Sequence, residues 1–362
     1  MRTPLLLLSF TNIASFVFIT ASTSYLLVFL LKIEESKRGV TLGYLETIDQ
    51  VVSLVGCPLW GMLSEVIGQR DVCLVGISLM IVGLILHPVA LICIPGTLAE
   101  VPRSLVLARI LFSAGGSATV TMLTTFASFL AENQDATKIS SLLGISSGIG
   151  AMFSAFILNR LPSLLAVHLP ISQAISATFG MMVLILFITG AIILVSVPLM
   201  ISSSKENSKS VTEYDIAALT SGLIARINTV SPHLFLPLWI LQKCRAYHPD
   251  RDVFKFSKST SSTLLGICQL FALASAPIFA IFGKKIRPKF ALLLMTAIGA
   301  LSYSCLFLVR SPMDTQLYLL MIVIGVVEIG SVILSLAYHI ATCGVSGKKS
   351  GVYGLMGSLG II

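Results

Sequence analysis

The sequence of 362 residues has very few charged side chains: Asp, Glu, Lys and Arg together make up 11% of the chain. Soluble domains carry roughly 25%. So low a share excludes a water-soluble protein of this size, because a soluble core this large would need a charged surface around it. Apolar residues make up 56% of the chain, and the mean hydropathy is +0.96. The chain is therefore expected to place most of its surface in lipid.

The chain also lacks the residue groupings on which most enzymes and metalloproteins depend. Its seven cysteines show no metal-binding or disulfide spacing, and its five histidines do not cluster. The pair Gly115-Gly116 lies in an apolar run rather than after a strand, so no phosphate-binding loop is predicted. We therefore predict no enzyme activity, no cofactor and no metal. The net charge of +8 lies mostly in loops, which indicates contact with lipid headgroups and not with nucleic acid.

Long apolar runs are what the sequence has instead. A helix needs about 20 mainly apolar residues to cross a bilayer, and backbone in lipid must satisfy its own hydrogen bonds, so these runs are expected to be helices. The polar breaks predict ten spans, at 5–31, 42–63, 72–94, 104–131, 139–160, 173–201, 214–241, 260–282, 290–309 and 315–340. An eleventh begins near Gly351 and stops at Ile362. The predicted fold class is an all-α, multi-pass membrane protein.

The polar gap between the second and third runs carries the most specific pattern, Gly61-Met-Leu-Ser-Glu-Val-Ile-Gly-Gln-Arg70. So short a gap must form a tight hairpin at one membrane face. Gly61 and Gly68 remove side chains where helices crowd, while Glu65 and Arg70 place opposite charges at the interface. The order Gly-x-Leu-Ser-acid-x-x-Gly-x-Arg resembles the loop between helices 2 and 3 of the major facilitator superfamily. That loop usually has Asp where Glu65 stands and Arg where Gln69 stands.

An internal repeat supports this resemblance. Residues 58–70 align without gaps on residues 277–289, an offset of 219, and each copy has a helix-end proline, an apolar pair, a small residue and a charged hairpin. Transporters built from two related halves show such repeats. The resemblance implies an MFS-type fold of two pseudo-symmetric six-helix halves, at 1–201 and 214–362, joined by a cytoplasmic linker at 202–213.

By that comparison the second half is incomplete, with about ten complete spans in the chain plus part of an eleventh. We expect the chain to be truncated at its C-terminus relative to a twelve-helix protein. A natural ten-helix protein with a short tail is the alternative.

Charge does not decide the orientation in the membrane. With the N-terminus inside, eleven lysines and arginines fall on each side, so the positive-inside rule gives no answer. In the superfamily both termini and the hairpin between helices 2 and 3 are cytoplasmic, and the resemblance implies the same here. Composition fits the plasma membrane and an internal membrane such as the vacuole equally well. We expect a monomer in the lipid bilayer.

A few polar side chains inside the predicted spans are candidates for a substrate or proton pathway. A charged residue at the centre of a span costs at least about 2.5 kcal/mol and usually marks a functional site. The candidates are Glu46 and Asp49 in the second span, Arg109 in the fourth, Arg226 and Asn228 in the seventh, and Glu328 in the tenth. Structural roles stay open for them, such as hydration at a helix end or pairing between helices.

Arg109, followed by small residues four and six positions later, resembles the helix-4 pattern of the superfamily. In proton-coupled members this arginine biases the protonation of a nearby acid. The first span of this chain holds no acid, so the available partners of Arg109 are Glu46, Asp49 and Glu328.

The hairpin and its second copy are predicted to act in the conformational change and not at the substrate site. This gate group contains Gly61, Glu65, Gly68, Arg70, Lys284, Lys285 and Lys289. Glu65 aligns with Lys284, so only the first copy offers an acid that could hold a gate closed. A further small-residue pattern, Gly144-x-x-x-Gly148-x-Gly150, predicts close approach of the fifth span to its neighbours.

The resemblance implies a secondary active transporter of a small solute, which binds near mid-membrane between the halves and is exposed alternately on the two sides. A proton on Asp49 or Glu328 would be exchanged during a proton-coupled cycle. The alternative is a non-transporting or inactive truncated relative with a receptor-like or regulatory role. Neither the helix-5 Gly-Pro of drug–proton antiporters nor the signature of sugar porters is present, so no substrate is predicted.

Overall fold

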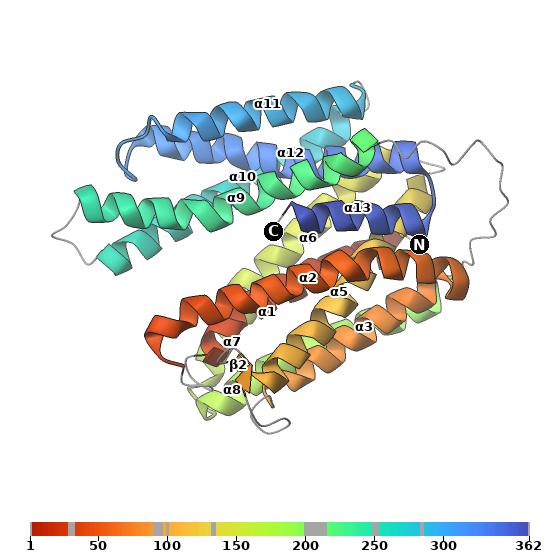
Figure 1. Cartoon of the computed structure of the whole chain (residues 1–362), viewed down its shortest axis with the longest axis horizontal. Coiled ribbons are helices and arrows are strands. Elements are labelled where there is room, and N and C mark those ends of the chain that lie inside the picture. Colours follow the sequence, from red (N-terminus) through yellow and green to blue (C-terminus); the bar gives the residue numbers. More distant parts are fainter. Residues whose placement is uncertain are drawn as a thin grey trace.

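The computed structural model describes residues 2–27, 33–89, 97–98, 101–131, 135–198, 216–247, 253–282 and 286–360. Long helices dominate this part of the chain (Figure 1). Its first helices are α1 (Arg2–Tyr25), α2 (Glu35–Ile67), α3 (Gln69–Leu86), α5 (Arg103–Ala131), α6 (Ala136–Phe156), η2 (Leu158–Arg160), α7 (Leu161–Leu165) and α8 (Ile171–Ser196). The later helices are α9 (Ile216–Tyr247), α10 (Val253–Phe282), α11 (Pro288–Leu306), α12 (Thr315–Cys343) and α13 (Gly347–Leu359). Two short strands, β1 (Thr97–Leu98) and β2 (Val101–Pro102), pair antiparallel before α5.

Each of the ten predicted spans coincides with one long helix, and the eleventh with α13. Eight helical segments of the described residues are long and apolar enough to cross a membrane, and α9 and α10 contain shorter apolar stretches. The predicted starts were too late in several helices. α2 begins at Glu35 rather than 42, and α10 at Val253 rather than 260. Polar residues at these ends continue the helix because helical hydrogen bonding does not stop where the hydrocarbon stops.

The helices form two groups, which are separate in Figure 1. In the first, α5 packs against α2 and α3, α1 against α6, and α8 against α3. In the second, α12 packs against α9, α10 and α11. Each group has its own apolar core, including Phe18, Met80 and Phe112 in the first and Leu264 and Met321 in the second. The bounds of the predicted halves stay a prediction, and the predicted linker at 202–213 lies outside the described residues.

The small-residue face predicted for the fifth span is confirmed in α6. A Cβ added at Gly144 would lie 3.1 Å from a side-chain carbon of Ile333 in α12, and one at Gly148 would lie 2.8 Å from Leu273 in α10. α6 therefore connects the first group of helices to the second. Gly150 faces the other way and lies against the backbone of Phe10 in α1, within its own group.

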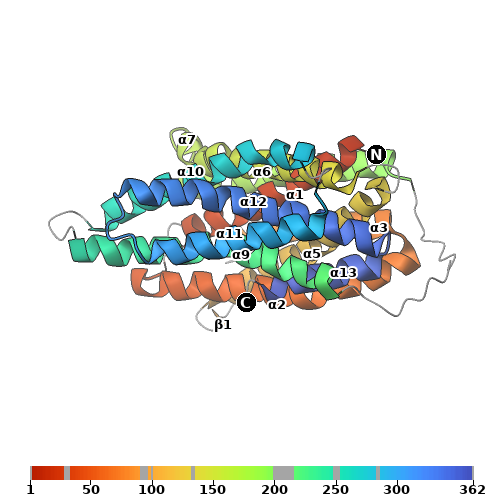
Figure 2. The ribbon, with the colours of Figure 1, turned by 90° about the horizontal axis from the view of Figure 1, so that it is seen from above.

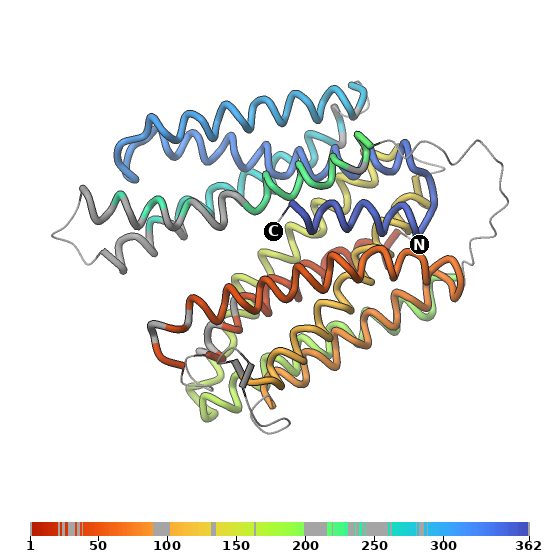
Figure 3. Tube along the Cα trace, in the orientation of Figure 1, coloured from red at the N-terminus to blue at the C-terminus, as the bar shows by residue number. Residues whose placement is uncertain are grey.

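The two groups meet mainly at one end of the molecule. There α13 lies beside the second half of α2, next to the α2–α3 hairpin (Figure 2). Toward the other end, α9 and α10 diverge from α1 and α2 in Figure 1, and Figure 3 draws the chain in the same orientation as a trace. The hairpin end is thus the closed end of the interface between the two groups.

Candidate functional site

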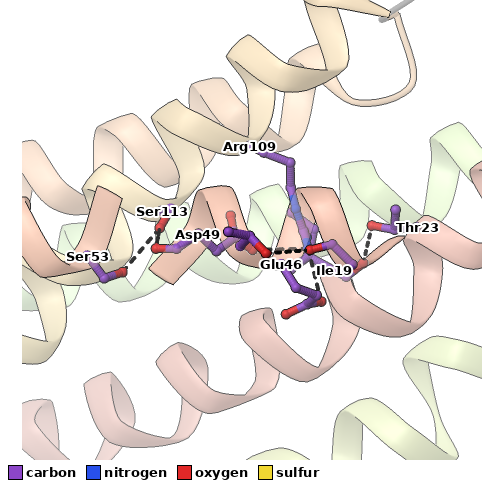
Figure 4. A network of polar contacts seen from close by, with 9 residues as sticks. Ile19, Thr23, Glu46, Asp49, Ser53, Arg109 and Ser113 are labelled. Atoms are coloured by element: carbon purple, nitrogen blue, oxygen red, sulfur yellow. Dashed lines mark hydrogen bonds and ion pairs between the residues drawn. The ribbon is translucent and has the colours of Figure 1, made fainter. Parts of the chain in front are cut away.

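Three of the predicted site residues come together between α2 and α5 (Figure 4). Arg109 of α5 is fully buried, and its Nη2 lies 3.0 Å from Oδ2 of Asp49 and 3.1 Å from Oε1 of Glu46. The Asp49 side chain is 8% exposed and that of Glu46 is 42% exposed. The two acids are three residues apart on α2, so they share one helix face. Arg109 therefore pairs with helix-2 acids, one buried and one open to its surroundings.

Neighbouring polar contacts hold α2 and α5 in this register. Ser113 lies one turn after Arg109 and donates a hydrogen bond to the backbone oxygen of Asp49 at 2.7 Å, and its hydroxyl lies 3.2 Å from that of Ser53. Two turns further along α2, Nε1 of Trp60 donates to the backbone oxygen of Ala114 at 2.9 Å. These bonds tie the α2 backbone to α5, so the carboxylate of Asp49 is placed by the helix and not by its own side chain alone.

The charge of this cluster is unbalanced. Two carboxylates and one guanidinium sum to a charge of −1 when both acids are ionised, and one proton makes the group neutral. In the described part of the chain, Oδ1 of Asp49 and Nε and Nη1 of Arg109 are buried without a hydrogen-bond partner. Unsatisfied polar atoms of this kind are rare and costly inside proteins. The cluster thus has spare hydrogen-bonding capacity for a proton, water or a polar solute.

Glu328 lies in a second polar cluster, between α12 and α10. It is 6% exposed, and Nε2 of Gln269 donates to its two carboxylate oxygens at 3.0 and 3.2 Å. The thiol of Cys268 donates to the same carboxylate at 3.5 Å. Glu328 was one of three candidate partners for Arg109. The ion pairs of Arg109 are instead made with the two acids of α2.

The two candidates on α9 have different surroundings. Asn228 is buried, its backbone oxygen accepts a hydrogen bond from the Tyr303 hydroxyl at 3.0 Å, and its Nδ2 has no partner in the described residues. Arg226 is partly buried beside α13, where a Cβ added at Gly357 would lie 3.4 Å from its Cγ. Arg226 has no hydrogen bond or ion pair within the described part of the chain.

Two of the predicted gate residues, Gly61 and Glu65, lie at the seam between α2 and α13. Gly61 is so close to the backbone of Gly347 that a side chain at either position would collide with the other helix. Oε1 of Glu65 accepts hydrogen bonds from the Ser346 hydroxyl at 3.0 Å and from the Lys348 amide at 3.2 Å. Glu65 therefore binds the first turn of α13, where unpaired amides and the helix dipole favour a negative charge.

Gly68, Arg70 and Lys289 do not join this contact. Gly68 ends α2 with φ of 98°, a conformation that glycine adopts without strain and that turns the chain into α3. Arg70 pairs with its neighbour Asp71 at 3.1 Å and not with Glu65. Lys289 is exposed near the start of α11, and Lys284 and Lys285 lie outside the described residues.

Several polar partners were not predicted from the sequence: Ser53, Asp71, Gln269, Tyr303 and Ser346. Asp71 and Ser346 carry a local signal, since an acid next to a basic residue and a serine before a helical glycine are visible in the sequence. The others are ordinary polar residues whose partners lie on a different helix. No pattern along one helix shows which residue of another helix it will meet.

Comparison with known proteins shows which protein family and which solved structures the chain resembles. The family model of the Major Facilitator Superfamily matches residues 11–362. No curated protein sequence matches the chain significantly. Among solved structures, the proton:xylose symporter XylE is 15% identical, with a TM-score of 0.69 over 99% of this chain and 86% of its own.

Two further solved structures are similar to the same degree. A variant of the fucose:proton symporter FucP from E. coli is 11% identical, with a TM-score of 0.67 over 99% of this chain and 88% of its own. A bacterial homologue of the iron transporter ferroportin, in an outward-facing state, is 14% identical, with a TM-score of 0.70 over 99% and 89%. Identities this low establish the shared fold, and the substrates belong to those proteins.

Proposed function

Because the chain belongs to the Major Facilitator Superfamily, we propose that it carries a small solute across a membrane by alternating access and couples this movement to protons. Membership of the family supports a secondary transporter in a multi-pass membrane protein and not an enzyme. One observation carries the coupling hypothesis: a buried arginine shared by two acids, Glu46 and Asp49, at the interior of the helix bundle.

Asp49 is the favoured proton carrier of the cluster. A proton on its carboxyl group neutralises the charge of the cluster, while Glu46 stays paired with Arg109. Glu46 is 42% exposed and can stay hydrated, whereas Asp49 is almost enclosed and depends on Arg109 for its charge compensation. Glu328 is a weaker candidate because an amide and a thiol already bind its carboxylate.

Alternating access then requires the seam at the hairpin end to open. In the present state α2 and α13 are in contact there, and Glu65 binds the first turn of α13. Rocking the two groups of helices about their shared interface would separate this seam and bring the opposite ends together. The gate residues Gly61 and Glu65 act in this change and do not contact solute.

The test is transport by purified protein in liposomes that contain a pH-sensitive dye. Sugars, carboxylates, phosphate and amino acids are added in turn, and a transported solute is expected to move protons with it. Asp49→Asn removes the proton site but keeps the size of the side chain. We expect this variant to lose proton movement while it still exchanges labelled solute across the membrane, because exchange needs no net proton transfer.

The control is Asp314→Asn. Asp314 precedes α12 and its carboxylate accepts a hydrogen bond from the Ser311 amide, a role that asparagine can also fill. This variant is expected to keep both activities. Proton movement that persists in Asp49→Asn refutes the assigned carrier, and a wild-type protein that moves no solute refutes the transport function.

A further inference from the structure

Arg226 is a cation inside the bundle that makes no ion pair with any of the described residues. It lies within the seventh predicted span, partly buried, and the stem of its side chain runs along the glycines of α13. A Cβ added at Gly357 would lie 3.4 Å from its Cγ and 3.7 Å from its Nε, and one added at Gly360 would lie 3.1 Å from its Cβ. The glycines thus leave room for the stem between α9 and α13.

The Nε of Arg226 lies beside α13, the helix that packs against both α2 and α9. It is close enough to Cys57 of α2 and to Tyr353 of α13 to interact electrostatically with both. α2 belongs to the first group and α9 to the second, and α13 packs against both of these helices. Arg226 therefore lies where alternating access requires a solute to bind, between elements that move relative to each other.

Within the described residues, no acid forms an ion pair with Arg226. The sequences of α9 and α13 contain no aspartate or glutamate. On α2, Glu46 and Asp49 are already bound to Arg109, and Glu65 binds the start of α13. Within the described residues, the ion pairs of the structure involve Arg70 and Arg109 and leave out Arg226.

The two arginines of the interior therefore differ in a way that indicates different roles. Arg109 is fully buried and has two carboxylates, so its charge is more than compensated. Arg226 has none, although an uncompensated cation within a membrane span is costly. A guanidinium presents its donors in a planar fork that matches the two oxygens of a carboxylate or phosphate. The missing counter-ion has the chemistry of an oxyanion.

We propose that the transported solute is an anion and that Arg226 binds its carboxylate or phosphate group directly. This inference rests on the proposed transport function and names its substrate class. Binding of the anion and of a proton would then neutralise two charges in the interior. The oxyanion compensates the positive charge of Arg226, and the proton compensates the extra negative charge of the two carboxylates beside Arg109.

The test is binding of simple oxyanions to the purified protein. Phosphate, succinate and lactate are titrated separately, with glucose as a neutral probe, and affinity is measured by calorimetry and by the shift in melting temperature. We expect at least one oxyanion to bind and glucose to have no effect. Arg226→Gln is expected to weaken that binding about tenfold to a hundredfold, since a charge-assisted hydrogen bond is lost. Arg226→Lys should keep part of the affinity, because the charge remains without the fork.

The matched control is Arg310→Gln, which removes an exposed arginine between α11 and α12 and should leave binding unchanged. The melting temperature without ligand checks that each variant is folded. If Arg226→Gln does not fold, Arg226→Lys is used for the binding test in its place. No binding of any of the three oxyanions, or equal binding by Arg226→Gln, refutes the proposal. The oxyanion whose affinity falls most in Arg226→Gln shows whether the site binds a carboxylate or a phosphate group.

Flux measurements separate this proposal from the transport function. A neutral solute that is transported equally by wild type and Arg226→Gln would refute the anion site and leave the transporter in place. An oxyanion that binds through Arg226 but is moved by neither protein would support the site and refute transport.

Discussion

Among single residues, Arg109 is a buried charge whose compensation depends on the packing of a neighbouring helix. Its side chain is fully buried, and both of its contacts go through one nitrogen to two acids of a neighbouring helix. Ser113, one turn away, fixes the backbone of Asp49 against the same helix. The residue thus has a packing role and an electrostatic role, and both depend on α2 and α5 staying in register.

Replacing Arg109 by methionine tests this requirement. The substitution keeps most of the volume but leaves Asp49 buried without a cation, and breaking a buried ion pair by removing one partner costs about 3–5 kcal/mol. We expect a clearly lower melting temperature in detergent. In contrast, Glu46→Gln should change stability by less than about 1 kcal/mol, because its pair with Arg109 is partly exposed. Equal destabilisation by the two variants would contradict the assigned roles.

Among elements, the start of α13 is the one most dependent on another helix. Ser346 caps the helix with its own side chain, which accepts a hydrogen bond from the Lys349 amide. Glu65 adds a second contact from α2, through the Ser346 hydroxyl and the Lys348 amide. The first turn of α13 is therefore stabilised in part by a helix from which it would separate in the proposed alternating-access cycle.

Glu65→Ala is expected to favour opening of this seam. Loss of a capping side chain costs about 1 kcal/mol, which increases the open population roughly fivefold. Cys57 provides the measurement, because it is 3% exposed and packs against Gly351 and Gly354 of α13. With the other six of the seven cysteines replaced, a maleimide should label Cys57 about fivefold faster in Glu65→Ala than in the parent. Glu65→Gln keeps an acceptor oxygen, so its labelling rate should lie between those of the parent and Glu65→Ala. Identical labelling rates in all three proteins would exclude a stabilising role for Glu65.

For the whole molecule, the important feature is that the two groups of helices touch at the hairpin end and diverge at the other (Figure 1). Glycines make the close contact possible at Gly61, Gly347 and Gly351. If the hairpin is cytoplasmic, as the family resemblance implies, this arrangement corresponds to an outward-facing state. Transport then requires the closed seam to separate once in every cycle.

A cross-link across the seam is expected to stop transport. A Cβ at Gly354 of α13 would lie 3.1 Å from Cβ of Cys57 in α2, close to the separation of about 3.5–4.5 Å found in disulfides. In a background that keeps Cys57 and replaces the other native cysteines, oxidised Gly354→Cys should be inactive and regain flux on reduction. The control pair Ser9→Cys/Ser147→Cys replaces two hydroxyls 2.7 Å apart within the first group. Its cross-link should leave flux intact, and full activity of the oxidised seam pair would contradict the need for opening.

The helices themselves could be predicted from the sequence because membrane insertion depends on local hydrophobicity. Each of the ten runs became a helix. The two prolines of the repeat, Pro58 and Pro277, were expected at helix ends and lie inside α2 and α10 instead. The ends were less predictable, since polar residues of α2 and α10 extend the helix beyond the apolar run. α13 also starts earlier, at Gly347, because Ser346 caps it.

By itself, the sequence determined that this protein is a bundle of membrane helices in two related parts, and which few ionisable residues lie within it. Only the tertiary structure decided how those residues pair. The sequence left three acids open to Arg109, and the packing of α5 on α2 selected Glu46 and Asp49. The packing of α12 on α10 placed Glu328 beside Gln269, and Arg226 makes no ion pair within the described residues. The physical reason is that hydrophobicity acts along one helix, whereas an ion pair depends on the rotation and height of two helices relative to each other.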